Sequence, residues 1–219
     1  MITQNVSTTA VDDALSCTTG DRHFRAYDLV AQGISGSFTM NSLTMASWGS
    51  GTVQVFVYTY TGTVGAATLN LGLTTLVGQS NPTAVVGSGP ADVTFTIPLA
   101  APAVIPAGSK FVVEQRFVAG GLFSIAGNYA GATQPSYLMA PPCGLGVPTS
   151  YASIGFNIHL LQVLNGTSVQ LGTPVIQQIS GLPSGSEFPI GTVQNCFNLV
   201  SPLTGAVIAN CCFNINVLE

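Results

Sequence analysis

The residues of this chain that have the side-chain chemistry for catalysis or metal binding are five cysteines, two histidines and a few charged groups. The cysteines are Cys17, Cys143, Cys196, Cys211 and Cys212, and no two of them form a C-x-x-C pair. His23 and His159 lie far in sequence from all of them except Cys17. A zinc site normally needs closely spaced thiolate and imidazole ligands. We therefore predict no metal site and no cofactor, and we expect disulfides formed in an oxidising compartment.

Charged residues are rare, and their spacing favours structural roles. Glu114 and Arg116 stand two residues apart, which places them on one face of a strand and predicts an ion pair. His159, in FNIHLLQV, is more typical of a core or interface histidine than of a general base. The densest charged cluster comprises Asp21, Arg22, His23, Arg25 and Asp28. We expect this cluster to be a surface ion-pair network, with a ligand or calcium contact as the alternative.

Motifs for enzymatic chemistry are missing from the sequence. The nucleophile elbow G-x-S-x-G does not occur, nor does either glycine-rich phosphate loop, G-x-x-x-x-G-K-[ST] or G-x-G-x-x-G. Glycoside hydrolysis needs two carboxylates in one cleft, and Glu114 has no obvious partner in sequence. We therefore predict no catalytic residues and a protein that is not an enzyme.

Composition excludes two further classes of function. Only 5% of the 219 residues are charged, and the formal net charge is -4. Four basic residues cannot neutralise a phosphate backbone, so we predict no nucleic-acid partner. Glycine or proline interrupts every long apolar run before it reaches about 18 residues, which predicts no membrane-spanning helix. The N-terminus lacks the basic start and apolar stretch of a signal peptide.

The elements that must position these residues follow from an apolar pattern of period two, which is typical of β-strands. In TVQVFVYTY, Val53, Val55 and Val57 fall on one face of a strand, and the aromatic residues Phe56, Tyr58 and Tyr60 fall on the other. These rings are either a possible glycan-contact platform or the second buried face of a central strand. Strands are expected at residues 23–29, 36–48, 52–61, 66–77, 91–99, 110–118, 122–129 and 156–164. The pattern predicts an all-β sandwich or jelly roll.

A boundary between two parts of the chain is expected within VLNGTSVQLGTP, residues 163–174. We predict an N-terminal arm at 1–14, a β-sandwich at 15–164 and a small β module at 165–219. A module of roughly 50 residues buries too little apolar surface to offset its chain entropy. It therefore needs additional stabilisation.

The small module carries a specific pattern in residues 173–217. It comprises the block SGLPSGSEFPIGT, a hairpin turn closed by Gly205, and a final strand CCFNINV with alternating apolar residues. This pattern resembles the second half of a hyalin-repeat (HYR) module. The resemblance implies an immunoglobulin-like β-sandwich of an extracellular or cell-surface protein associated with adhesion. The first half of such a module is missing, so the remaining strands are expected to leave an apolar face and an unpaired edge uncovered.

The preceding part also has a resemblance, carried by four segments: FRAYDL (24–29), VIPAGSKFVVE (104–114), APPCG (140–144) and IGFNIHLLQVLNG (154–166). They resemble the jelly-roll-like domain of secreted Bacteroidetes surface proteins. Cys17 and Cys143 resemble a terminal pair of cysteines in those relatives, which implies that they are bridged.

The second expected disulfide follows from hairpin geometry. If the turn is centred between Leu203 and Thr204, Cys196 stands opposite Cys211 and Cys212 is left as a possible free thiol. A register slip of one residue would make Cys212 the partner instead.

The N-terminal segment ITQNVSTTAV is uncharged and favours extended structure. We expect it to act as a strand-donor arm, through Ile2, Val6 and Val11, that pairs with a neighbouring copy. Such a head-to-tail contact would give a homo-oligomer or fibre. The sequence as a whole predicts a non-enzymatic structural or adhesion protein of an extracellular or particle surface that self-assembles or mediates attachment. A carbohydrate-binding module and a phage virion protein are the alternatives.

Overall fold

The structure is a computed structural model of the chain, and it describes residues 1–10, 14–18, 20–86, 93–169, 172, 174–202 and 205–218. The chain divides into two compact units, Met1–Val169 and Gln170–Glu219. This division falls inside the segment 163–174, five residues beyond the predicted 164/165 boundary.

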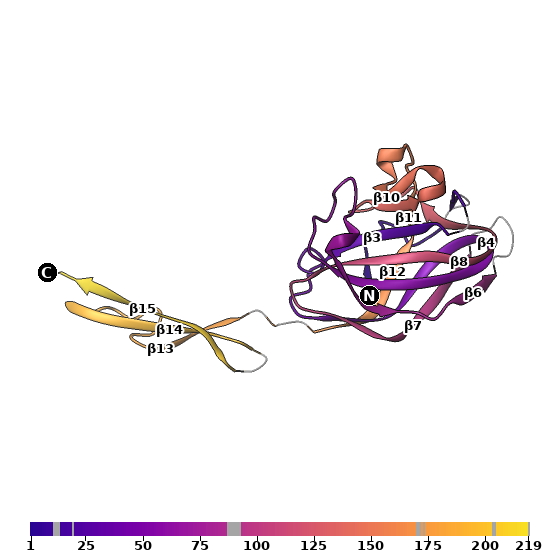
Figure 1. The fold of residues 1–219 in the computed structure, drawn as a ribbon. Coiled ribbons are helices and arrows are strands. Elements are labelled where there is room, and N and C mark those ends of the chain that lie inside the picture. The colour runs from indigo at the N-terminus through magenta and orange to yellow at the C-terminus, as the bar shows by residue number, and fades with distance from the viewer. Residues whose placement is uncertain are drawn as a thin grey trace. The chain divides into compact units, whose positions relative to one another are not determined.

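The first unit is built almost entirely of antiparallel strands (Figure 1). Three short 3-10 helices, η1 (Leu71–Leu73), η2 (Pro141–Cys143) and η3 (Ala152–Ile154), interrupt them. The strands are β1 (Ile2–Thr3), β2 (Ala14–Leu15), β3 (Arg22–Asp28), β4 (Phe38–Tyr60), β5 (Thr74–Gln79), β6 (Thr83–Val86), β7 (Val93–Ile105), β8 (Lys110–Asn128), β9 (Ser136–Ala140), β10 (Leu145–Ser150), β11 (His159–Leu160) and β12 (Gln162–Ser168).

Strands β4 and β8 form the centre of one curled sheet with the order β1-β12-β4-β8-β3-β9-β10, to which the remaining strands of the unit add by pairing with β4 or β8. β4 and β8 pair from Ala46 opposite Ala126 to Tyr60 opposite Lys110. Buried apolar side chains lie on both faces of this sheet: the large core includes Tyr27, and a smaller cluster on the opposite face includes Phe24 and Tyr137. The all-β sandwich expected from the sequence is therefore the observed fold class.

Each of these two long strands replaces two strands that the sequence predicted separately. The sequence predicts strand breaks where Gly49, Gly51, Gly120 and Gly121 lie. The pairing of β4 with β8 continues across these glycines, with a register shift between Gly49 and Gly51. Gly49 has a φ of 84°, a conformation that glycine adopts without steric cost. A β-bulge of this kind bends a strand without ending it. The sequence prediction of separate strands is wrong for this reason.

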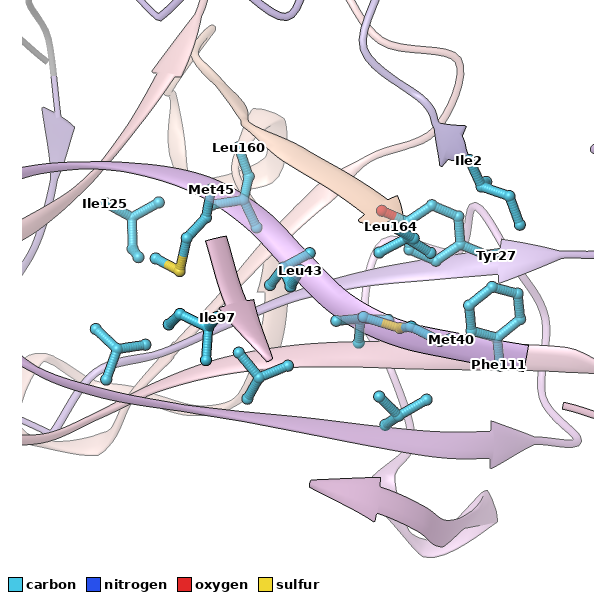
Figure 2. Close-up of a cluster of buried hydrophobic side chains, with 14 of the residues drawn as sticks. Ile2, Tyr27, Met40, Leu43, Met45, Ile97, Phe111, Ile125, Leu160 and Leu164 are labelled. Atoms are coloured by element: carbon cyan, nitrogen blue, oxygen red, sulfur yellow. The ribbon is translucent and has the colours of Figure 1, made fainter. Parts of the chain in front are cut away.

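A continuous apolar core fills the interior of the first unit. Figure 2 shows Met40, Leu43 and Met45 of β4 among side chains from several other strands, all fully or almost fully buried. The rings of Tyr27 and Phe111 stack with their centres 5.0 Å apart. Each buried side chain of this size stabilises the fold by about 1.5–3 kcal/mol relative to exposure.

The second unit is a three-stranded antiparallel sheet of β13 (Val175–Ser180), β14 (Gly191–Val200) and β15 (Val207–Val217), in that order. The stretch GLPSGSEFPIG connects β13 to β14, and its glycines Gly181, Gly185 and Gly191 all have positive φ. This stretch is therefore a turn between strands, as its composition predicted. The single sheet corresponds to half of a two-sheet sandwich.

Candidate functional site

The three strands of the second unit present two chemically different faces. Their register places Ile176 opposite Leu199, Leu199 opposite Ala209, and Phe197 opposite Cys211. One face, which we call the apolar face, carries the polar Gln178 and Asn195 together with Ile176, Val193, Phe197, Leu199, Ala209, Cys211, Phe213, Ile215 and Val217. The opposite face carries the Cys196–Cys212 bridge and Gln177, Thr192, Gln194, Asn198, Asn210, Asn214 and Asn216, with the valines Val175, Val200 and Val207 at one end. The sheet is therefore amphipathic.

The apolar face is exposed in this chain. Ile176 is 71% exposed and Phe213 is 48% exposed, and the Phe213 ring stacks on Phe197 with the ring centres 5.8 Å apart. Among the described residues of this unit, only Asn195 and Cys196 are buried. Glu187 and Glu219 are the only charged residues in the sequence of the unit. An exposed apolar surface without charge is the usual mark of an interaction surface.

The connection between β13 and β14 covers one end of this face. The side-chain amide of Gln178 donates to the backbone carbonyl of Leu182 at 2.7 Å and to Asn195 Oδ1 at 3.3 Å. A Cβ atom added to Gly181 would lie 2.1 Å from Asn195 Oδ1, so only glycine permits this approach. The Gly-Pro-rich stretch thus covers Asn195, which lies on this face directly opposite Phe213, and leaves the Phe213 side chain exposed.

The structure contains one of the two disulfides predicted from the sequence and a different partner for the other. Cys17 and Cys143 are bridged, with their Cα atoms 6.5 Å apart, which confirms that prediction. The second bridge joins Cys196 to Cys212, not to Cys211, and Cys211 is an exposed free thiol. The prediction of Cys212 as the free thiol is therefore wrong.

The physical reason for that error is a bulge in the hairpin. Val200 pairs with Val207, as a turn centred between residues 203 and 204 requires, but Leu199 pairs with Ala209. The extra residue, Ile208, shifts every later pair by one position, which brings Cys212 opposite Cys196.

The N-terminal arm is part of the first unit. Ile2 is buried and pairs with Leu164 of the same chain, and the side-chain amide of Gln4 donates to the Ala26 carbonyl at 2.7 Å. Val6 is exposed, and Val11 lies outside the described residues. The expectation of an arm free to pair with a neighbour is wrong because β12 of its own chain offers an edge to which the arm adds.

The predicted aromatic platform does not present three free rings. Arg116 lies over the ring of Phe56 at 4.2 Å from its centre, and Phe56 is buried. The Tyr58 hydroxyl donates to Glu114 Oε2 at 2.9 Å. Tyr58 is half-buried, and Tyr60, although largely buried, lines a groove of about 770 Å³ together with Thr61, Thr63, Leu69, Asn70, Leu71 and Val147.

Glu114 is a structural anion held between two arginines. Its fully buried carboxylate accepts from Arg22 at 2.7 and 2.9 Å and from Arg116 at 2.6 and 3.2 Å. Burial alone would raise the pKa of Glu114, but the hydrogen bonds from Arg22 and Arg116 outweigh it and hold the pKa below its ordinary value. The predicted pairing of Glu114 with Arg116 is confirmed, and the sequence missed Arg22 as the second partner.

The cluster around His23 is not a surface network. Asp21, His23 and Arg25 are all fully buried, and Arg22, which lies on the opposite face of β3, pairs with Glu114. The Asp21 carboxylate accepts the backbone amides of Cys17 and Thr18. The surface prediction is wrong because β3 is covered on both faces. His159 is half-buried at the start of β11, and burial lowers its pKa.

Within the described ranges, no three residues among His, Cys, Asp and Glu are grouped to hold a metal ion. No helix in the same ranges has the length and apolar character to cross a bilayer.

No protein-family model matches the chain, and no curated protein matches it.

Proposed function

We propose that this chain is a non-enzymatic structural protein of an extracellular or particle surface, and that it self-associates through the apolar face of its second unit. The observation that carries the proposal is this exposed, uncharged and aromatic-centred sheet face. Burying such a face against an identical one removes apolar area from water on both copies at once.

The chemistry of the apolar face favours a second copy as its occupant. The face bears no charge, so two copies meet without like-charge repulsion and without desolvating an ion. If two copies meet with twofold symmetry, the stacked rings of Phe197 and Phe213 in one copy lie against the same rings in the other. Two sheets packed in this way would complete the two-layer arrangement that the single sheet lacks.

The disulfides support the proposed location. Cys17 bridges Cys143 and Cys196 bridges Cys212, and structural disulfides persist in oxidising surroundings such as the cell exterior. A surface of Thr, Ser, Asn and Gln with few charges suits a protein that packs closely beside copies of itself.

The test uses two neighbouring residues of β15 that lie on opposite faces. Phe213→Asp puts a carboxylate in the centre of the apolar face, and Asn214→Asp puts the same group on the polar face as a matched control. We expect the full-length protein to be oligomeric by light scattering, Phe213→Asp to be monomeric, and Asn214→Asp to remain oligomeric. A monomeric full-length protein at micromolar concentration, or equal behaviour of the two variants, would contradict self-association through this face.

The groove beside Tyr60 favours a second function, carbohydrate binding by the first unit. A tyrosine ring with neighbouring threonine and asparagine side chains offers both a surface for a sugar ring and hydrogen bonds for its hydroxyls. Saturable binding on a glycan array that is lost in Tyr60→Leu and kept in Tyr58→Phe would support this function, because Tyr58 lies outside the residues that line the groove.

A further inference from the structure

A buried arginine in the first unit carries a charge that no described residue neutralises. Arg25 of β3 is fully buried, and its Nε and Nη2 donate to Ser136 Oγ at 3.2 and 3.0 Å. Its Nη1 has no hydrogen-bond partner within the part of the chain that the structure describes. The ion pairs found there join Glu114 to Arg22 and Arg116, and none includes Arg25.

The surrounding side chains cannot remove this charge. Burial lowers the pKa of Arg25, but a guanidinium remains protonated in proteins. Burial raises the pKa of the neighbouring hydroxyls of Tyr27 and Tyr151, so both stay neutral. A buried charge without a counter-charge is strongly unfavourable. Asp21 is also fully buried, and its charge, like that of Arg25, acts on Tyr151, but its carboxylate accepts hydrogen bonds from Ser16, Cys17 and Thr18. Among the described residues, no carboxylate therefore pairs directly with Arg25.

Two further polar groups without partners lie on the same face of the sheet as Arg25. His23 is two residues away on β3, and Gln115 of β8 stands directly opposite His23. His23 Nε2 and both polar atoms of the Gln115 amide lack partners within the described residues. Neighbouring positions of this kind place side chains within reach of one another. They could supply additional hydrogen bonds to the same bound species.

A pocket borders two of the residues that contact this cluster. A pocket of about 250 Å³ is lined by Ser136, Tyr151, Ile158 and His159, among others. Ser136 is the residue that holds the Arg25 guanidinium, and the Tyr151 hydroxyl lies 2.6 Å from His23 Nδ1. Two residues of the pocket wall, Ser136 and Tyr151, thus contact Arg25 and His23, which themselves lie behind the wall.

We propose that a small monovalent anion, of the size and charge of chloride, binds inside the first unit against Nη1 of Arg25, beneath the pocket lined by Ser136 and Tyr151. The charge of the anion distinguishes it from a buried water molecule, which would satisfy the hydrogen bonds but leave the guanidinium unpaired.

The experiment measures chemical unfolding while chloride replaces gluconate at constant ionic strength, because gluconate is too large to enter. We expect the unfolding equilibrium constant to fall about tenfold for each tenfold rise in chloride above its dissociation constant. Arg25→Met, which keeps an unbranched apolar side chain in place of the stem of arginine and removes the charge, should lose this dependence. Lys110→Met, which removes a cation elsewhere in the unit, should keep it.

A second measurement does not depend on any variant folding. Crystals of the unaltered protein soaked in bromide should show an anomalous peak within hydrogen-bond distance of Arg25 Nη1. Chloride-independent unfolding of the unaltered protein, an equal chloride response in Arg25→Met, or the absence of that bromide peak would each overturn the proposal.

Discussion

At the scale of single residues, the few charged groups of the first unit act mainly inside the protein. The Glu114 carboxylate joins three strands, since it accepts from Arg22 of β3 and from Arg116 on its own strand β8, and the Tyr58 hydroxyl of β4 donates to it. The two arginines also cover the rings of Phe24 and Phe56. Glu114 thus organises a face of the sheet that the sequence suggested for binding sugars.

Replacing Glu114 should destabilise the first unit. Glu114→Gln leaves two arginines beside a neutral amide, and we expect a loss of about 3 kcal/mol, at the lower end of the range for buried pairs because both arginines reach solvent. Urea unfolding of this variant against Glu187→Gln, which removes an exposed carboxylate, measures the difference. Equal stability of the two variants would show that Glu114 is dispensable.

The same residue should set part of the acid sensitivity of the protein. The pKa of Glu114 in the folded state lies below its ordinary value of 4.5. Its contribution is therefore fully present above about pH 4.5 and is lost as the pH falls through the folded pKa. We expect the unaltered protein to lose more stability than Glu114→Gln between pH 4.5 and pH 2.5, as measured by the urea midpoint at each pH. Parallel pH profiles would contradict this assignment.

At the scale of strands, the sequence predicted the type of structure well and the positions where strands end less well. Alternating apolar residues identified β3, the first half of β7 and the start of β12, because a half-buried strand imposes period two on its residues. The predicted breaks at Gly49 and Gly120 are wrong, because glycine is common both in β-bulges and in turns and the sequence does not distinguish the two. The sequence missed β9 because it is short and lies between Pro135 and Pro141, and it missed β10 because Gly146 and Pro148 are typical of loops.

The same limit applies to the candidate site. The hairpin in the second unit, and the need for a partner to Cys196, were predictable from the sequence. The choice between Cys211 and Cys212 was not, because it depends on the bulge at Ile208 and no residue type there marks it. The burial of Arg25 was also unpredictable, since it depends on the pairing of β3 with both β8 and β9.

The bend in β4 gives a prediction about Gly49. Alanine at a φ of 84° costs about 1–2 kcal/mol, because its Cβ crowds the following carbonyl. We expect Gly49→Ala to lower the stability of the first unit by that amount. Gly146→Ala is the control, since Gly146 has no atom within 4 Å of an added Cβ. Equal urea midpoints for the two variants would mean that the bulge adapts to a side chain.

The observed register predicts different effects for two adjacent cysteines. Cys212→Ser removes the bridge to Cys196, whose loop spans 16 residues, and should cost about 3 kcal/mol. Cys211→Ser should change little, because Cys211 is a free thiol. Hydrogen exchange of the β14 and β15 amides reports this loss, and peptide mapping without reductant should find Cys196 joined to Cys212 in the Cys211→Ser variant. Loss of that bridge in Cys211→Ser would show that the bulge is absent.

At the scale of the whole molecule, the two units differ in what holds them together. The first unit has a continuous apolar core and one disulfide that joins residues 126 positions apart. The second has a disulfide across two neighbouring strands, and almost no buried side chains among its described residues. The need for extra stabilisation in so small a unit was predictable from its length alone. The apolar face is where we propose that a second copy supplies this stabilisation.

This difference predicts how the chain behaves when the second unit is removed. A chain ending at Val169 retains β1 to β12, the core and the Cys17–Cys143 bridge, so it should fold and melt cooperatively by itself. It should also be monomeric by light scattering at concentrations where the full chain associates, because it lacks the apolar face. The Phe213→Asp full-length variant provides the control, since it keeps the second unit and loses only the centre of that face. An oligomeric 1–169 chain would place the association on the first unit and would contradict the proposed role of the second.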